Sequence, residues 1–309
     1  MTGSITAAPL LKDSRRGLFR DRVLREIKED TTLPAISGSA QRLQTVVDEK
    51  DVSLDEVAQI VKTDPGLASK FLRLANSSYF GGKSIASIED ALFRLGMGEV
   101  RRMAQVVGVM DRVSHLKVKV DWKVFMLHCL LTGRLTERLA AAFRELSGKE
   151  YLAGFLHDMG KLYLEHFYPG EFEAVILRVL ERGTAMHEVE EELIGITHAE
   201  ISALLCEKWN VNKEVCRSIR FHHEPDSPFN RNPVNPEEQI LLAACICFAD
   251  ALANICKANI HGTQHVQDVD FETLQGWRLL QQLAPRATLD LDVEKELSQS
   301  VELLNSFGV

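Results

Sequence analysis

The chain has 309 residues, enough for a sizeable apolar core in one large domain or two smaller ones. Hydrophobic residues make up 45% of it and charged residues 26%, which excludes a disordered or fibrous protein. The 36 Lys and Arg against 44 Asp and Glu leave a net charge of -8, so we expect no nucleic acid as the main partner.

Apolar residues recur at three- and four-residue spacing along most of the chain, which predicts an all-α fold, a helical bundle. The basic N-terminal segment is interrupted by Asp13 and Asp21, which favours a solvated or partner-binding helix over a nucleic-acid tail. Three further helix starts carry capping signals. These signals are Ser53 with Glu56, Asp64 with Pro65, and Ser87 with Asp90.

The middle of the chain begins with residues 115–121, whose period-two alternation predicts an extended connector. A helix over about 121–146 follows, and then one apolar helix that includes Leu152, Phe155 and Leu162. Pro169 and Gly170 close this second helix.

Two capped helices are expected next, one from Thr197 to Trp209 and one from Asn212 to His223. Residues 224–236 are rich in Pro, Asn and Asp and predict a long surface loop. An apolar helix through Ile255 and an amphipathic helix over 288–306 complete the chain.

No segment of the sequence predicts a membrane anchor. The longest purely apolar run, residues 240–249, is about half of what spans a bilayer. The N-terminus lacks the charged-then-apolar order of a signal peptide. We therefore expect a cytoplasmic protein without a membrane partner, whose six scattered cysteines are buried free thiols.

Two carboxylates fall in apolar surroundings. Asp158 follows the stretch 152–156, and Asp250 is the only charged residue between Ile240 and Ile255. A buried carboxylate costs several kcal/mol unless it is paired, hydrogen-bonded or bound to metal. Both residues therefore require cationic partners.

Histidines spread along the chain can supply that compensation. In chain order the set is His128, His157, Asp158, His198, His222, His223 and Asp250. Imidazole and carboxylate ligands from separate helices suit one or two divalent ions, and favour Fe, Mn, Ni or Zn over Mg. Any one of these histidines alone is better explained as a core residue with a hydrogen-bond partner.

Several phrases in the sequence are specific enough to suggest a family. They are Leu33-Pro34, residues 63–67, residues 72–81, Ile88 to Ala91, Leu95-Gly96, and Leu156 to Leu162. Over about residues 30–225 the chain resembles the HDOD family, the HD-related output domain of bacterial signalling. It also looks like the wider HD superfamily of metal-dependent phosphohydrolases.

The resemblance implies roles for individual residues. The seven histidines and aspartates align with the metal ligands of HD proteins, including the additional ligands of the HD-GYP branch. Asp158 and Lys161 are the candidate catalytic residues, since Lys161 aligns with a lysine that faces substrate phosphate. As an alternative, Lys161 is a surface residue that caps the end of its helix.

The resemblance also implies an arrangement of domains. We expect an N-terminal arm over 1–29, a helical HDOD subdomain over 30–110, an HD-like metal-site subdomain over 111–285, and a C-terminal helix over 286–309.

One feature of the HD-GYP branch is missing. After His222-His223-Glu224 the chain continues without a Gly-Tyr-Pro sequence, so cyclic di-GMP is not expected as a substrate. Two functions remain. The first is a regulatory or interaction module that binds a signalling protein or a small phosphate-containing ligand. The second is an active phosphohydrolase of nucleotides, cyclic nucleotides or other phosphate esters.

Three other histidines are not expected to form a site. His187 precedes the acidic stretch 188–192, which is most simply a solvated helix face. His261 and His265 flank a Gly-Thr turn without a supporting partner in the sequence.

Overall fold

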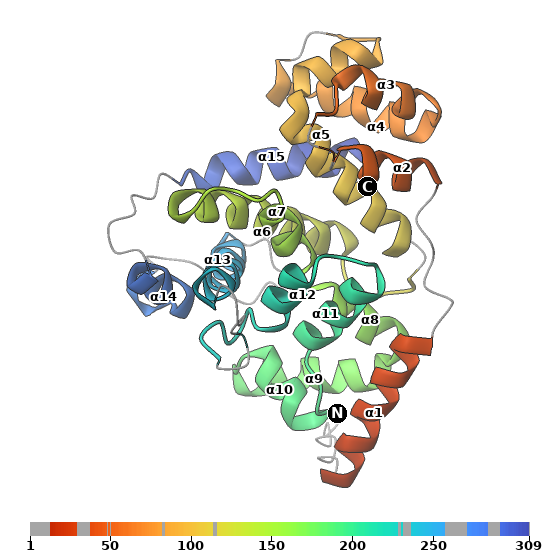
Figure 1. Ribbon diagram of the computed structural model, residues 1–309. Helices are drawn as coiled ribbons and strands as arrows, with labels where there is room; N and C mark the ends of the chain where they lie inside the picture. The colour runs from red at the N-terminus through yellow and green to blue at the C-terminus, as the bar shows by residue number, and fades with distance from the viewer. Residues whose placement is uncertain are drawn as a thin grey trace, which may run out of the picture. The chain divides into compact units, whose positions relative to one another are not determined.

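The computed structural model describes most of the chain (Figure 1). The described residues are 13–29, 38–47, 49, 51–81, 84–113, 116–227, 230, 236–256, 271–283 and 291–308. Among them the regular elements are α-helices and short 3-10 helices, without a strand. The all-α prediction is therefore confirmed.

The chain forms two compact units, each built from segments that are not consecutive in the sequence. The first unit takes its residues from 1–31, 116–119 and 156–243, and the second from 32–115, 120–155 and 244–309. The boundaries expected from the sequence divide the chain by family resemblance, and they stay a prediction.

The first unit carries six complete helices and most of the histidines. Its helices are α1 (Asp13–Glu29), α8 (Met159–Phe167), α9 (Pro169–Arg182), α10 (Met186–Leu193), α11 (His198–Lys208) and α12 (Lys213–Arg220). Helix α11 packs against α8 and α12, and α9 packs against α8 and α10. The histidine cluster described below takes its residues from α10 and α11, from the turn before α8 and from the turn after α12.

Helix α1 belongs to this unit and packs against it through one face. It buries Phe19, Val23 and Ile27 and contacts α11. Arg20 pairs with Glu200 of α11 at 2.6 Å, and the Lys208 ammonium donates to the Ile27 carbonyl at 2.6 Å. At least Arg20 of the basic segment therefore serves a contact within the protein.

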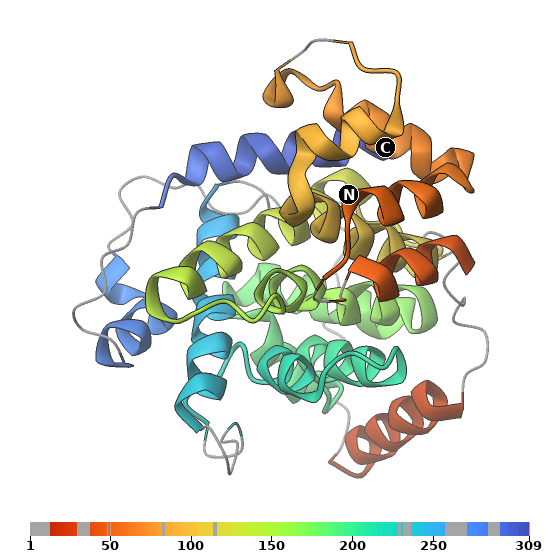
Figure 2. The same cartoon turned by 45° about the horizontal axis from the view of Figure 1, so that its top comes forward.

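The second unit contains the helices that follow α1 along the chain and the C-terminal helix. Its elements are α2 (Gly38–Val47), α3 (Leu54–Lys62), α4 (Pro65–Ala75), η1 (Ser78–Phe80), α5 (Ile88–Val113), α6 (Trp122–Phe143), η3 (Phe271–Thr273), α14 (Gln275–Leu283) and α15 (Val293–Ser306). Helix α5 packs on α2, α3 and α4. Helix α15, at the blue end of the colour bar, lies against α6 and α4 (Figures 1 and 2).

The predicted helix caps of the N-terminal third are confirmed. Ser53 and Glu56 form a capping box, the Asp64 carboxylate accepts from two backbone amides, and the Asp90 amide donates to Ser87. The sequence did not predict that α5 continues beyond Gly96 to Val113. Gly96 has φ 74°, where the helix is kinked, and Val100, Met103 and Val107 are buried beyond it.

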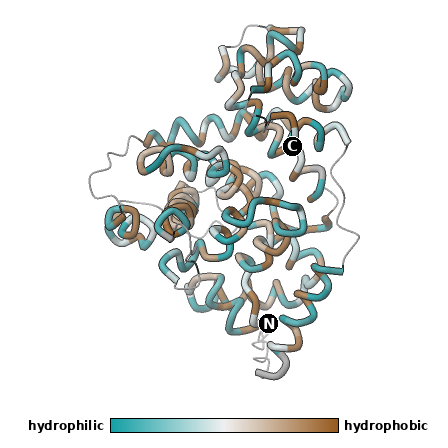
Figure 3. Tube along the Cα trace, in the orientation of Figure 1, coloured by the Kyte–Doolittle hydropathy of each residue, from teal (hydrophilic) through white to brown (hydrophobic). Residues whose placement is uncertain are grey.

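Helices α7 (Glu150–Leu156) and α13 (Pro236–Ile255) each take residues from both units. The stretch Glu237–Ile255 of α13 has the length and mean hydropathy, 1.5, of a membrane-spanning helix, and 61% of it is buried. Hydrophobic residues follow one another along this helix in Figure 3. A buried core helix has the same composition.

Two expectations fall partly or wholly outside the described residues. The loop expected over 224–236 is described only through Ser227 and at Asn230, both of which are buried. His261 and His265 lie outside the described residues.

Candidate metal centre

His157 and Asp158 lie in a turn between two helices. The sequence predicted one continuous apolar helix here, but α7 ends at Leu156 and α8 begins at Met159. Asp158 has φ -105° and ψ 3°, outside helical geometry. The prediction of a single helix was wrong because the apolar pattern continues across the break, so periodicity does not reveal it. His157 and Asp158 are both buried.

Asp158 has the cationic partner that its burial demands. The Lys161 ammonium donates to Asp158 Oδ2 at 2.6 Å from the first turn of α8. His198 Nε2 lies 3.2 Å from Oδ1, and His157 Nε2 lies 3.3 Å from Oδ2. Lys161 is therefore part of the cluster, and not a surface residue that caps the end of its helix.

His198 is the first residue of α11, as its capping signal predicted. Thr197 is the N-cap, and its hydroxyl accepts from the Glu200 amide at 3.2 Å. Helices α8 and α11 approach closely at Gly160, whose amide donates to the Ser202 hydroxyl at 2.7 Å. A Cβ on Gly160 would lie 2.1 Å from the His198 carbonyl oxygen. A glycine there therefore lets Asp158 come within reach of His198.

His222 and His223 lie in the turn that follows α12. The sequence predicted that this helix continues to His223, but it ends at Arg220. The Asn212 cap at its start is confirmed. Beyond the helix, His222 Nδ1 lies 2.7 Å from the Ile219 carbonyl, which fixes the ring because only a protonated Nδ1 can donate to it.

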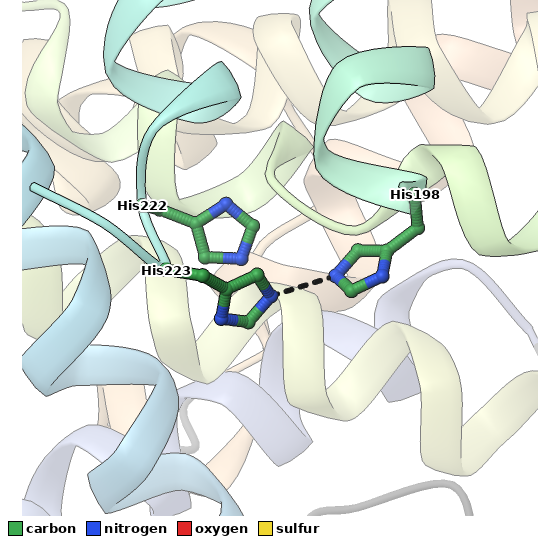
Figure 4. A group of neighbouring side chains, drawn as sticks. All are labelled: His198, His222 and His223. Carbon is green, nitrogen blue, oxygen red and sulfur yellow. Dashed lines mark hydrogen bonds between the residues drawn. The ribbon is translucent and has the colours of Figure 1, made fainter. Parts of the chain in front are cut away.

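The rings of three histidines from α11 and this turn meet in space (Figure 4). His198 Nε2 and His223 Nε2 are 2.9 Å apart. The rings of His222 and His223 have centroids 3.9 Å apart, and the ring of His157 packs edge-on against His222 at 5.1 Å. One nitrogen from each of His198, His222 and His223 lies within 4.8 Å of the others.

The spacing of these ligand atoms fits a transition-metal ion. Metal-nitrogen bonds are about 2.1 Å long, so neighbouring ligand atoms at right angles are about 3 Å apart. The distances from His198 Nε2 to His223 Nε2 and to Asp158 Oδ1, 2.9 and 3.2 Å, are of this size. The donor set of imidazole nitrogens and one carboxylate suits Fe, Mn, Ni or Zn.

The second unit holds the other two predicted ligands as a pair. His128 of α6 and Asp250 of α13 approach with Nε2 and Oδ1 3.1 Å apart. The Asn254 amide donates to the same carboxylate oxygen at 3.0 Å. His128 is buried, and the Asp250 side chain is 16% exposed. The structure thus groups five of the predicted ligands in one unit and two in the other.

Two residues of the cluster escaped the sequence prediction. The ring of His187 stacks on that of His223, with centroids 4.2 Å apart and an interplanar angle of 13°. Glu190 is fully buried and bonds to His198, so the stretch 188–192 is not uniformly solvated as expected. A signal was present, because Glu190 lies three or four positions from the apolar Met186, Leu193 and Ile194.

The surroundings of His198 raise its affinity for protons. Burial is the largest single influence and would lower the pKa of His198. The Glu190 carboxylate and the hydrogen bond to Asp158 together outweigh it, and the pKa is raised. For His187 burial prevails, with a contribution from nearby His198, and its pKa is lowered.

A groove of about 1870 Å³ opens beside His223 in the first unit. Its lining includes His187, Arg220 and Glu224. Among the five cluster ligands in this unit, His223 is half-buried, and the other four are at most 1% exposed. The groove therefore reaches the cluster on the His223 side.

The sequence matches the HDOD domain over residues 33–225, well over half of the chain. The chain belongs to the HDOD family. An uncharacterized protein of Treponema pallidum is 27% identical to this HDOD protein over 221 residues. That match takes in 71% of the present chain and 41% of the relative, so the HDOD protein spans less than half of the relative's length.

Crystal structures of bacterial proteins share the fold. An HDOD domain protein of unknown function from Geobacter sulfurreducens superposes with a TM-score of 0.72 at 24% identity, covering 95% of this chain and 97% of the other. A candidate phosphohydrolase from Shewanella amazonensis gives 0.66 at 23% identity, covering 92% and 97%. A candidate signal transduction protein from Marinobacter aquaeolei gives 0.63 at 21%, covering 97% and 67%.

Proposed function

We propose that this HDOD protein is a metal-binding regulatory module that acts as an output or interaction element in bacterial signalling. The observation that supports it best is the convergence of His157, Asp158 and His198 with the His222-His223 pair in one compact unit. These residues come from three separate stretches of the chain, and their nitrogen and oxygen atoms are spaced as metal ligands are.

The proposed ligands are the seven residues that the family resemblance implies, five of them in the first unit and His128 with Asp250 in the second. One or two divalent ions would supply positive charge and Lewis acidity there. The residues of the chain set the conditions for binding: His222 is fixed by the Ile219 carbonyl, and Lys161 holds Asp158.

The regulatory part of the proposal follows from where the ligands lie. They stand at the start of α8, at the start of α11 and just beyond the end of α12. A common ion would tie these three helix ends together and stiffen the surface that they form. A signalling protein or a small phosphate-containing ligand would then meet this surface. The cytoplasm is the proposed location, and neither nucleic acid nor a membrane is proposed as a partner.

Elemental analysis of protein purified without chelator tests the metal site. We expect at least one Fe, Mn, Ni or Zn ion per chain, and a loss of metal in His198→Gln. The matched control is His166→Gln, because His166 lies on α8 and its Nδ1 accepts from the Lys117 amide outside the cluster. Wild-type protein without any of these metals would refute the site.

Hydrogen exchange of loaded and chelated protein tests the regulatory part. We expect chelation to speed exchange at the starts of α8 and α11 and around residues 220–224, since these segments carry the ligands. Identical exchange in both forms would refute a metal-dependent output.

A second candidate function is hydrolysis of a phosphate ester. It is favoured by Lys161, whose ammonium lies against Asp158 and whose side chain is 17% exposed. An ammonium in this place can hold a phosphate oxygen while water adds to phosphorus and the bond to the leaving group breaks. The test compares metal-loaded wild type and Asp158→Ala on bis(p-nitrophenyl) phosphate and on nucleotides. Equal background rates would reject this candidate.

A further inference from the structure

Glu190 is a buried carboxylate that the proposed ligand set does not include. It lies on α10 (Met186–Leu193) and is fully buried, whereas its neighbours Glu188 and Glu191 are exposed. A carboxylate in such a place costs several kcal/mol unless its environment compensates for the lost water. The contacts that compensate for its burial therefore indicate the role of Glu190.

One oxygen of Glu190 makes two contacts with the same histidine. Its Oε2 accepts from the His198 backbone amide at 2.8 Å and lies 2.7 Å from His198 Nδ1. An ionised carboxylate oxygen can only accept a hydrogen bond, so this contact requires a proton on Nδ1, which it donates to Glu190. In the neutral ring this arrangement leaves the lone pair on Nε2.

Nε2 is the nitrogen that faces the rest of the cluster. It lies 2.9 Å from His223 Nε2 and 3.2 Å from Asp158 Oδ1. Glu190 thus binds the Nδ1 side of the His198 ring, and the Nε2 side points at the other ligands. A metal-ligating histidine commonly has its second nitrogen held in this way, and the partner fixes both the tautomer and the ring orientation.

Helix capping alone does not account for Glu190. The backbone amide of His198 lies in the first turn of α11, where an amide has no acceptor within its own helix, and Glu190 accepts its hydrogen bond. Thr197 already serves as N-cap of that helix through the Glu200 amide. The contact with Nδ1 adds nothing to capping, and it acts only on the ring.

We infer that Glu190 is a positioning residue, which selects the tautomer of His198 and aims Nε2 into the cluster. This inference rests on the proposed metal-binding function. Without the carboxylate, His198 can rotate or exchange tautomers, so a bound ion would lose a preorganised ligand.

Cobalt binding to wild type, Glu190→Gln and Glu190→Leu tests the inference by chelator competition after overnight equilibration. We expect Leu to weaken binding about 10- to 100-fold, the usual cost of losing an outer partner of a ligating histidine. Glu190→Gln keeps an acceptor oxygen for Nδ1, so it should lose less cobalt affinity than Glu190→Leu. The matched control is Glu191→Leu on the exposed face of α10, which should bind as wild type does. Equal affinity in all four proteins would overturn the inference.

A second readout does not involve the metal. Long-range proton-nitrogen spectra of metal-free protein with labelled histidine distinguish the two neutral tautomers, and His198→Gln identifies the signals. Recorded above the pH at which these signals stop moving, wild type and Glu190→Gln should show Nδ1–H, and Glu190→Leu should lose this preference. A wild-type His198 with its proton on Nε2 would overturn the inference.

The two experiments separate the failure of each idea. If wild type binds no cobalt, the proposed metal site fails, while the tautomer measurement still decides whether Glu190 orients His198. If wild type binds cobalt and the tautomer does not depend on Glu190, the metal site stands and the positioning role falls.

Discussion

Gly160 sets the distance between the two helices that carry Asp158 and His198. The space for a side chain there is occupied by the His198 carbonyl oxygen, 2.1 Å from where a Cβ would lie. This atom belongs to the backbone, so it cannot move aside as a flexible side chain could. Any larger residue must push α8 and α11 apart or distort one of them.

We expect Gly160→Ala to lower the free energy of unfolding by about 1–3 kcal/mol, the usual cost of overpacking. Urea denaturation followed by circular dichroism measures it. Gly170→Ala is the control, because Gly170 is exposed in the first turn of α9 with no atom within 4 Å of an added Cβ. Equal stability of wild type and Gly160→Ala would contradict the close approach.

Glu150 gives the protein a defined weakness to acid. Burial alone would raise its pKa, but hydrogen bonds from the Ser147 amide and hydroxyl, together with Arg144 at 2.7 Å, lower it below the ordinary 4.5. A carboxylate with a lowered pKa stabilises the fold above its unfolded pKa. Its contribution falls as the pH drops below 4.5 and is lost as the pH passes through the folded pKa.

Glu150→Gln should therefore lose stability at neutral pH and show a smaller further loss between pH 4.5 and the folded pKa. Melting temperatures of both proteins across that range measure the effect. The exposed Glu145→Gln is the control and should follow wild type. If the melting temperatures of wild type and Glu150→Gln fall in parallel with pH, Glu150 is not the source of the acid sensitivity.

Residue patterns predicted the cluster better than they predicted its surroundings. Asp158 was expected to need a cation, and Lys161 supplies it. Glu190 was missed because it is one of four glutamates among residues 188–192, and composition alone does not show which one faces inward. The signal that could have found it is its spacing of three or four positions from the apolar Met186, Leu193 and Ile194.

At the level of elements, α15 is joined to its unit by buried charges as well as by apolar packing. Arg134 of α6 pairs with Glu99 of α5 at 2.8 Å and with Glu296 of α15 at 3.6 Å, and it also bonds to Gln299. All four side chains are almost completely buried. The buried Arg134 guanidinium therefore links carboxylates from two different helices.

We expect Arg134→Met to destabilise the protein by about 3 kcal/mol, because it breaks the buried ion pairs of Arg134. Glu99 and Glu296 would then keep only their more exposed partners, Arg102 and Arg138. Arg138→Met is the matched control, since Arg138 also pairs with Glu296, at 2.8 Å, but is half exposed. It should cost about 1 kcal/mol or less. Chemical denaturation compares them, and equal effects of the two variants would contradict a special role for the buried arginine.

Helix ends with a polar cap were predictable, whereas helix breaks inside apolar sequence were not. Ser53, Asp64, Thr197 and Asn212 all cap as expected, because a cap is a local hydrogen bond. The break at His157-Asp158 is not local. It places the two side chains toward α11 and the turn after α12, and the hydrophobic period passes through it unchanged.

At the scale of the whole molecule, each compact unit draws on distant parts of the chain. The seven proposed ligands are divided between the units, with His128 and Asp250 in the second. The sequence predicts that all seven serve one centre, and this stays a prediction. If it holds, a change in the second unit must alter metal binding by ligands of the first.

We expect Asp250→Ala to reduce the number or the affinity of bound ions, and chelation to lower the melting temperature of wild type by about 5 °C or more. Elemental analysis and thermal melts measure the two effects. Asp226→Ala is a control on a carboxylate outside the proposed ligand set. Unchanged metal content and affinity in Asp250→Ala would show that His128 and Asp250 do not take part in the metal binding of the first unit.

The depth of the cluster has a consequence for the rate at which an ion comes and goes. His157, Asp158, His198 and His222 are at most 1% exposed, and the groove reaches the cluster beside His223. An ion entering there must shed its water shell and pass between imidazoles that already touch one another. Exchange of a bound ion with ions in solution would therefore be slow, and the metal acquired during folding in the cell would stay bound during purification.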